Sequence, residues 1–102
     1  MKPGTITEDT AFAILTAYRE IKSATTLLAD IEQAIADRPS SFDLEHRYKR
    51  YQLGVPSGES STRIFDVRPE LAKSVVLAHI AEQERRLVEA NERARIELGA
   101  VS

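Results

Sequence analysis

The fold is decided by the segment Pro69–Leu98, whose sequence is PELAKSVVLAHIAEQERRLVEANERARIEL. After Pro69 it contains neither proline nor glycine, the two residues that interrupt helices. Pro69 suits the first helical position, where its missing N–H is not needed, and Gly99 suits the left-handed residue that closes a helix. The sequence therefore predicts a helix over about residues 69–98.

The two halves of this helix differ in their apolar pattern. The first half is apolar almost all round, so we expect it to be covered on more than one side. The second half keeps only an apolar stripe, formed by Leu87, Val88, Ala90, Ala94 and Leu98. Its other side is a charged, solvated face with opposite charges four residues apart, which pair Glu82 with Arg86, Glu89 with Arg93, and Arg93 with Glu97.

Another helix is predicted over about residues 7–37. Thr5 or Thr7 offers the capping hydroxyl, and Pro39 disfavours helical geometry at the residue before it. Apolar residues follow a heptad pattern that is typical of a coiled-coil seam, namely Ile14, Ile21, Leu28 and Ile35 with Ala17, Ala24 and Ile31 between them. We expect this seam to pack on the helix at 69–98 of the same chain, with its alanines allowing a close approach; the alternative is that it pairs only with another chain.

The connector, about residues 40–67, contains a predicted β-hairpin. Apolar and polar residues alternate over 51–55 and again over 63–67, on either side of the turn-rich PSGESS. Pro56 and Gly58 suit a type I turn in V-P-S-G. Two strands alone are marginal in water, so we expect the hairpin to lie on the start of the helix at 69–98 or to extend a sheet in a partner subunit. Residues 41–50 fit either a short helical turn or an extended segment.

The predicted fold class is mainly α (α+β), with two long antiparallel helices joined by a connector that contains the hairpin. The 102 residues fit a single domain, 1–102. The chain contains 42% hydrophobic and 29% charged residues and no cysteine, which is typical of a globular protein without disulfides. No apolar run is long enough to span a membrane, and the first residues lack the apolar core of a signal peptide. We therefore expect a cytoplasmic protein.

The helix lengths indicate self-association. Helices of about 30 residues are about 45 Å long, whereas a compact domain of this size has a radius of gyration of about 13 Å. One helix covers only one side of the other, which leaves part of the apolar start of the helix at 69–98 open. We therefore expect a homo-oligomer, most simply a twofold dimer that completes a four-helix bundle.

The sequence does not indicate an enzyme. His79 and Glu82 lie one helical turn apart, but a metal site in a bundle needs further ligands on facing helices. The hydroxyls between 57 and 62 have no histidine or lysine base at a characteristic spacing. We predict no catalytic residues, no metal site and no cofactor.

Two adjoining segments carry candidate ligand-binding residues. HRYKRY interleaves cations with aromatic rings, which suits phosphates and stacked bases. GVPSGESSTR supplies small residues, hydroxyls and backbone N–H groups that can cradle an anion. The predicted site comprises Arg47, Tyr48, Lys49, Arg50, Tyr51, Ser57, Gly58, Ser60, Ser61 and Arg63. A hairpin is expected to bring Arg63 back near the first strand.

QLGVPSG, followed by RIFDV and by PELAK at the start of a long helix, resembles small accessory proteins encoded by tailed phages and prophages. The resemblance covers most of the chain and carries no catalytic residues with it. It implies a protein that acts by stoichiometric binding, either masking a host protein or sequestering a nucleotide signal of antiviral defence.

Three functions follow as hypotheses. The first is capture of a small anionic, nucleotide-like ligand by the connector and hairpin of a homo-oligomer. The second is a protein–protein interaction module that masks or bridges a host or phage protein through its helical face or hairpin. The third, nucleic-acid binding, is disfavoured by the net charge of −2 and by the acidic residues of both helices.

Overall fold

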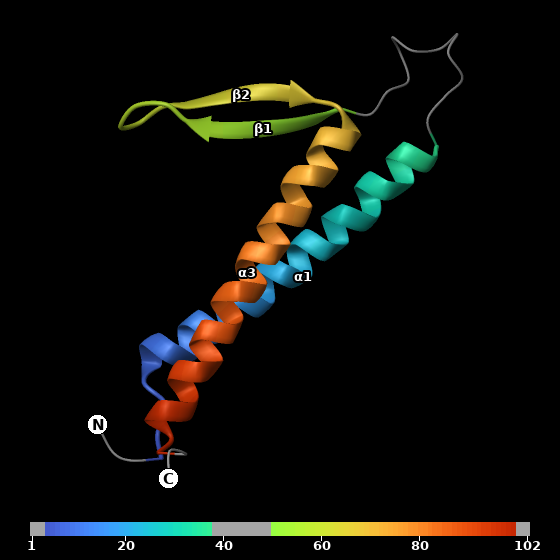
Figure 1. Ribbon diagram of the computed structural model, residues 1–102. Coiled ribbons are helices and arrows are strands. Elements are labelled where there is room, and N and C mark those ends of the chain that lie inside the picture. The colour runs from blue at the N-terminus through green and yellow to red at the C-terminus, as the bar shows by residue number, and fades with distance from the viewer. Residues whose placement is uncertain (1–3, 38–49, 100–102) are drawn as a thin grey trace, which may run out of the picture. The chain divides into compact units, whose positions relative to one another are not determined.

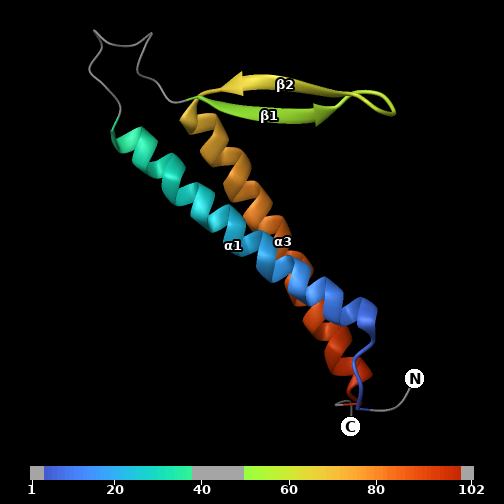
Figure 2. The same cartoon turned by 180° about the vertical axis from the view of Figure 1, so that it is seen from behind.

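The computed structural model describes residues 4–37 and 50–99, and it contains two long antiparallel helices and a two-stranded antiparallel sheet (Figure 1). Helix α1 spans Glu8–Ala36 and helix α3 spans Pro69–Glu97. Strand β1 spans Tyr51–Pro56 and strand β2 spans Thr62–Val67 (Figures 1 and 2). The predicted fold class is confirmed, and each predicted helix boundary lies within one residue of the observed one. The question of a helical or extended segment over 41–50 falls almost entirely outside the described residues.

The chain groups into two compact units. The first, termed unit 1, combines α1 up to Thr25 with α3 from Ala78 onward. The second, termed unit 2, is Thr26–Leu77 and contains the hairpin. Each unit therefore has its own core.

The core of unit 1 is built from small residues at heptad spacing. On α1 the buried positions are Thr10, Ala17 and Ala24, and on α3 they are Gln83, Ala90 and Ala94. The larger heptad residues Ile14 and Ile21 are only half-buried. Alanines occupy buried positions of the seam on both helices, as expected, and the close approach that they permit stays a prediction.

The start of α1 and the end of α3 are joined by a polar cluster in unit 1. Thr7 is the N-cap of α1, because its Oγ1 accepts a hydrogen bond from the N–H of Thr10 at 3.2 Å. The Glu97 carboxylate accepts the Thr7 N–H at 2.9 Å and the Thr10 hydroxyl at 2.7 Å. These bonds lower the pKa of Glu97, with the bond from the Thr7 backbone contributing most. As predicted, Gly99 follows the helix with a φ of 71°.

The core of unit 2 lies where the hairpin base meets the helices. Ile31, Val67, Ala72 and Val76 are buried there. The strands pair in the register Tyr51↔Val67 to Pro56↔Thr62, and Leu53 lies opposite Phe65. The predicted alternation is therefore confirmed, because the odd-numbered residues of both strands share one face of the hairpin.

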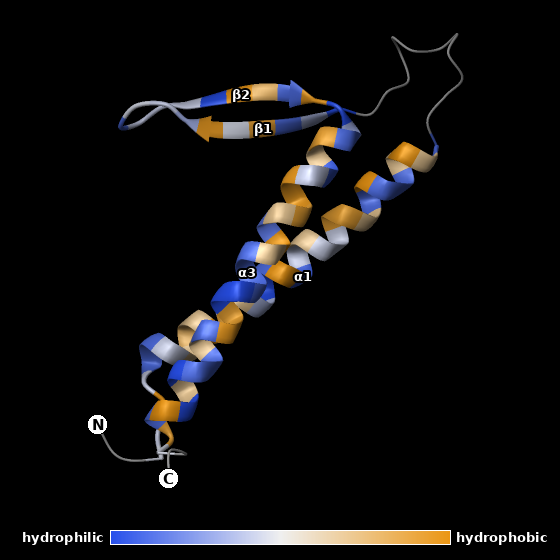
Figure 3. Cartoon of the chain, viewed as in Figure 1, coloured by the Kyte–Doolittle hydropathy of each residue, from blue (hydrophilic) through white to orange (hydrophobic). Residues whose placement is uncertain are grey.

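The first residues of α3 are covered on one side only by the described chain. Ala72 and Val76 are buried, whereas Leu71, Val75 and Leu77 are exposed. Figure 3 shows apolar residues distributed around this part of the helix. The expected cover on more than one side is thus absent from the described part of a single chain.

No helix in residues 4–37 or 50–99 combines the length and apolarity that a membrane span requires.

Candidate binding surface

The base of the hairpin is attached to the helical segments of unit 2. The Tyr51 hydroxyl donates a hydrogen bond to Oδ2 of Asp30 at 2.7 Å. Tyr51, Leu53 and Val67 line a mostly apolar hollow of about 180 Å³ together with α1 and α3 side chains. The helical side chains in this hollow are Leu27, Ile31, Ala72, Val75 and Val76. The expectation that the hairpin lies on the start of α3 is therefore confirmed for its base.

The part of the hairpin from the pair Leu53 and Phe65 to the loop carries exposed apolar side chains. Val55 is 41% exposed and Phe65 is 48% exposed, and both lie on the same face as Leu53. Ile64, on the opposite face, is 62% exposed. Figures 1 and 2 show the loop end of the hairpin extending beyond the start of α3. Two strands alone are marginal in water, so a partner that covers these side chains would stabilise the hairpin.

The outer edge of β2 presents backbone groups that no other strand within residues 4–37 and 50–99 pairs with. The Ser57 N–H donates to the Ser61 carbonyl at 2.9 Å, and this bond lies in register with the strand ladder. Antiparallel ladders alternate between hydrogen-bonded and non-hydrogen-bonded pairs. By this alternation, the backbone N–H and C=O groups of Thr62, Ile64 and Asp66 point away from β1. All three residues are exposed, so the edge is open to another strand.

The predicted ligand-binding residues fall into separate groups. Arg47, Tyr48 and Lys49 lie outside the described residues. Arg50 and Tyr51 lie at the base of the hairpin, whereas Ser57, Gly58, Ser60, Ser61 and Arg63 gather at its loop end. Arg63 lies opposite Val55, which is about 14 Å along β1 from Tyr51 at about 3.4 Å per residue. The hairpin returns Arg63 to the first strand as expected, but it does not bring Arg63 near Arg50.

The loop itself is formed by residues 57–61. Its ends are held by the bond from Ser57 to Ser61, and Gly58 has a φ of 89°, a conformation that favours glycine. Pro56 lies within β1 opposite Thr62, so the type I turn predicted with Pro56 at its second position is wrong. Proline is accepted there because its nitrogen faces the outer edge of β1 and owes no bond to β2.

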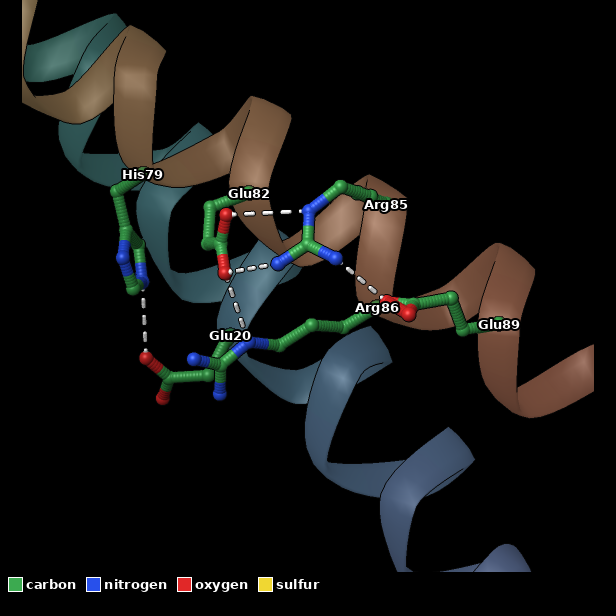
Figure 4. A network of polar contacts seen from close by, with 6 residues as sticks. All are labelled: Glu20, His79, Glu82, Arg85, Arg86 and Glu89. Carbon is green, nitrogen blue, oxygen red and sulfur yellow. Dashed lines mark hydrogen bonds and ion pairs between the residues drawn. The ribbon is translucent and has the colours of Figure 1, made fainter.

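A network of charged side chains covers one face of unit 1 (Figure 4). Arg85 bridges Glu82 and Glu89 at 2.6 Å each, and Arg86 contacts Glu82 at 3.1 Å. The hydrogen bonds from Arg85 and then Arg86 lower the pKa of Glu82, and the bond to Glu82 raises the pKa of Arg85. The predicted pair of Glu82 with Arg86 is confirmed. Glu89 pairs with Arg85 and not with Arg93 as predicted, because both carboxylates converge on one guanidinium.

His79 belongs to the same face. Its Nε2 lies 3.0 Å from Oε1 of Glu20 on α1, and Glu82 turns instead to its arginines (Figure 4). The pair of His79 and Glu82 considered as metal ligands is thus split between two sets of partners. Among residues 4–37 and 50–99, no three His, Asp or Glu side chains are placed to hold a metal ion.

A groove in unit 1 was not anticipated from the sequence. It has a volume of about 240 Å³ and is lined by Phe12, Ala13, Thr16, Ala17, Gln83, Arg86, Glu89 and Arg93. Its lining mixes an exposed ring, two guanidiniums and a carboxylate. The sequence offered only a weak indication of this groove, because its lining combines α1 and α3 residues about 70 positions apart in the chain.

The chain matches no protein-family model, no curated protein and no solved structure.

Proposed function

We propose that this protein is a non-enzymatic binding protein that acts by protein–protein interaction through the odd-numbered face of its hairpin. The observation that carries this proposal is the difference in exposure between the apolar side chains of that face. At the base, Val67 is buried and Leu53 is half-buried in the hollow against the helices, whereas Val55, nearer the loop, and Phe65, opposite Leu53, are exposed. Apolar side chains, aromatic ones above all, supply most binding energy at protein interfaces.

The attachment of the hairpin base to the helical segments also favours docking of a partner. The hairpin base is fixed by Val67 and by the bond from Tyr51 to Asp30, so the exposed side chains are presented on an anchored element. Anchoring reduces the conformational entropy that is lost on binding. In the phage-accessory context suggested by the sequence, the partner is a host or phage protein that the hairpin masks.

The experiment is quantitative co-purification of the tagged chain from its host cells. Val55→Ser and Phe65→Ser remove apolar surface from the docking face, and neither residue lines the hollow at the hairpin base. Val88→Ser is the matched control, because Val88 is 68% exposed on the charged half of α3. We expect the two hairpin variants to lose a protein that wild type and Val88→Ser both retain. Retention of every captured protein by all variants would reject this docking face.

Capture of an anionic, nucleotide-like ligand is a second candidate, supported by the loop end of the hairpin. Ser57, Gly58, Ser60 and Ser61 gather there beside Arg63. Native mass spectrometry of gently purified protein tests for a retained ligand. Because the hairpin separates Arg63 from Arg50, Arg63→Ala is expected to lose such a ligand and Arg50→Ala to keep it. A nucleotide-sized adduct on the Arg63→Ala variant would contradict a loop-end site.

A further inference from the structure

We propose that the outer edge of β2 pairs with the same edge of a second copy of the chain, forming a four-stranded antiparallel sheet about a twofold axis. The axis passes between the two copies of Ile64. This inference goes beyond the proposed function, because it concerns the backbone edge of β2. Of the two docking residues, Phe65 lies beside the added strand and Val55 does not.

The open edge supplies the first argument. Thr62, Ile64 and Asp66 direct three N–H groups and three C=O groups away from β1, and their side chains are exposed. In Figures 1 and 2, β2 forms the edge of the hairpin that is turned away from the start of α3. A second β2 strand can therefore approach this edge without displacing the helical segments of unit 2.

The register follows from counting these groups. In an antiparallel twofold pair, directly opposed residues lie on the same face, so only registers shifted by an even number of residues preserve the faces. With Ile64 opposite its own copy, Thr62 lies opposite Asp66 of the second copy. All outward groups of both strands then find partners. If the second strand is shifted by two residues in either direction, either Thr62 or Asp66 of each copy keeps its outward N–H and C=O groups without a partner.

Side chains in this register are complementary. Thr62 lies beside Asp66 of the second copy, so a hydroxyl donor meets a carboxylate acceptor. Arg63 lies beside Phe65 of the second copy, where a guanidinium meets an aromatic ring. The two copies of Ile64 meet on the even-numbered face and remove apolar surface from water. No two like charges are opposed, which is a condition for stable cross-strand pairs.

The outer edge of β1 is less suited to pairing. Its outward residues are Gln52, Gly54 and Pro56 by the same alternation. Pro56 has no N–H to donate, and proline on an edge strand is a common device against pairing. The two edges of the hairpin therefore differ, and the β2 edge is the one that accepts another strand.

Disulfide trapping tests the register directly, because the native chain contains no cysteine. In the proposed pair, the two copies of residue 64 have Cα atoms about 5.5 Å apart, within the range of about 4.4–6.8 Å that a disulfide spans. The two copies of residue 62 lie about 14 Å apart along the strands. Under mild oxidation, we expect Ile64→Cys to form a disulfide-linked dimer and Thr62→Cys to form none, as seen on a non-reducing denaturing gel. Equal cross-linking of the two variants, or none in Ile64→Cys, would overturn the proposal.

Size-exclusion chromatography with light scattering supplies a second test that needs no covalent bond. Wild type is expected to have twice the mass of one chain. Ile64→Pro removes an outward N–H and is expected to be monomeric, whereas Gln52→Pro removes an outward N–H from the other edge and is expected to remain dimeric. A monomeric wild type, or a dimeric Ile64→Pro, would overturn edge pairing.

The two proposals fail separately. Val55 lies on β1 and off the pairing edge, so Val55→Ser is expected to lose the captured partner while it remains a dimer. A wild-type monomer that still captures a partner through Val55 rejects the edge alone. A dimer whose captured proteins are unaffected by Val55→Ser and Phe65→Ser rejects the docking face alone.

Discussion

The hydroxyl of Thr10 donates a hydrogen bond to Oε2 of Glu97 at 2.7 Å, joining the first turn of α1 to the last turn of α3. The same carboxylate accepts the backbone N–H of Thr7, which is a free donor at the helix N-terminus. A negative charge at that position is also favoured by the dipole of α1. Charge-assisted hydrogen bonds to Glu97 therefore hold the two helix ends of unit 1 together, beyond the last residues of the apolar seam.

Acidification is expected to destabilise unit 1 through Glu97. Its pKa in the folded chain is lowered from the ordinary value of 4.5. Its stabilising effect is therefore present above that value and is lost as the pH falls through the folded pKa. Thermal unfolding of wild type from about pH 6 to about pH 3 is expected to show a declining midpoint, and Glu97→Gln is expected to show a flatter profile.

The control for this experiment is Glu84→Gln, which removes an exposed carboxylate elsewhere on α3. It is expected to follow the wild-type profile. A shallow residual slope in Glu97→Gln is expected, because the pKa of Glu82 is also lowered by its arginines. Superimposable profiles for wild type and Glu97→Gln would show that the cluster does not contribute to stability.

Ile31→Ala is expected to destabilise unit 2 strongly. Ile31 is 0% exposed and lies among the side chains that seat the hairpin base. Removing a buried isoleucine side chain to alanine lowers the free energy of unfolding by about 2–5 kcal/mol. Leu27→Ala is the matched control, because Leu27 lines the same hollow but is 42% exposed. Equal losses in urea-unfolding experiments would place the core of unit 2 elsewhere.

Ala90→Leu tests the close approach of the helices in unit 1. Ala90 is 1% exposed, so a larger side chain has no room and is expected to cost about 1–3 kcal/mol. Val88→Leu enlarges a residue that is 68% exposed and is expected to be nearly neutral. Chemical denaturation of both variants measures the difference. A fully tolerated Ala90→Leu would mean that the helices are not in close contact at this position.

His79 is expected to contribute little to stability. Its contact with Glu20 is exposed on both sides, and such pairs are worth about 0–1 kcal/mol. His79→Ala should therefore leave the midpoint of unfolding almost unchanged, and added Zn²⁺ should not raise the midpoint of wild type. A Zn²⁺-dependent increase that His79→Ala abolishes would restore the metal hypothesis.

Local sequence signals were sufficient for the elements of the fold. Pro69 and Gly99 mark the ends of α3, Thr7 marks the start of α1, and alternation marks both strands. These features act within a few residues, so they can be recognised before the chain is folded. Helix boundaries and strand faces were predictable for this reason.

The candidate site was less predictable, because the distances between its residues depend on the loop length and on the pairing register of the two strands. Adjacent positions in sequence suggested that Arg50 and Arg63 act together, yet a five-residue loop after a six-residue strand puts them at opposite ends of the hairpin. The partner of Glu97 lies 87 residues away, and no periodicity identifies it. The exposure of Phe65 likewise depends on how far along the hairpin the contact with the helices extends.

The proline at the end of β1 also sets the size of the proposed assembly. When two β2 edges have joined, the only free edges of the four-stranded sheet belong to the two β1 strands. Each carries Pro56, which has no N–H to offer a further strand. Addition of a third copy by the same backbone pairing is therefore opposed at both sides. The proposed assembly is therefore expected to stop at two chains and not to grow into open-ended fibres.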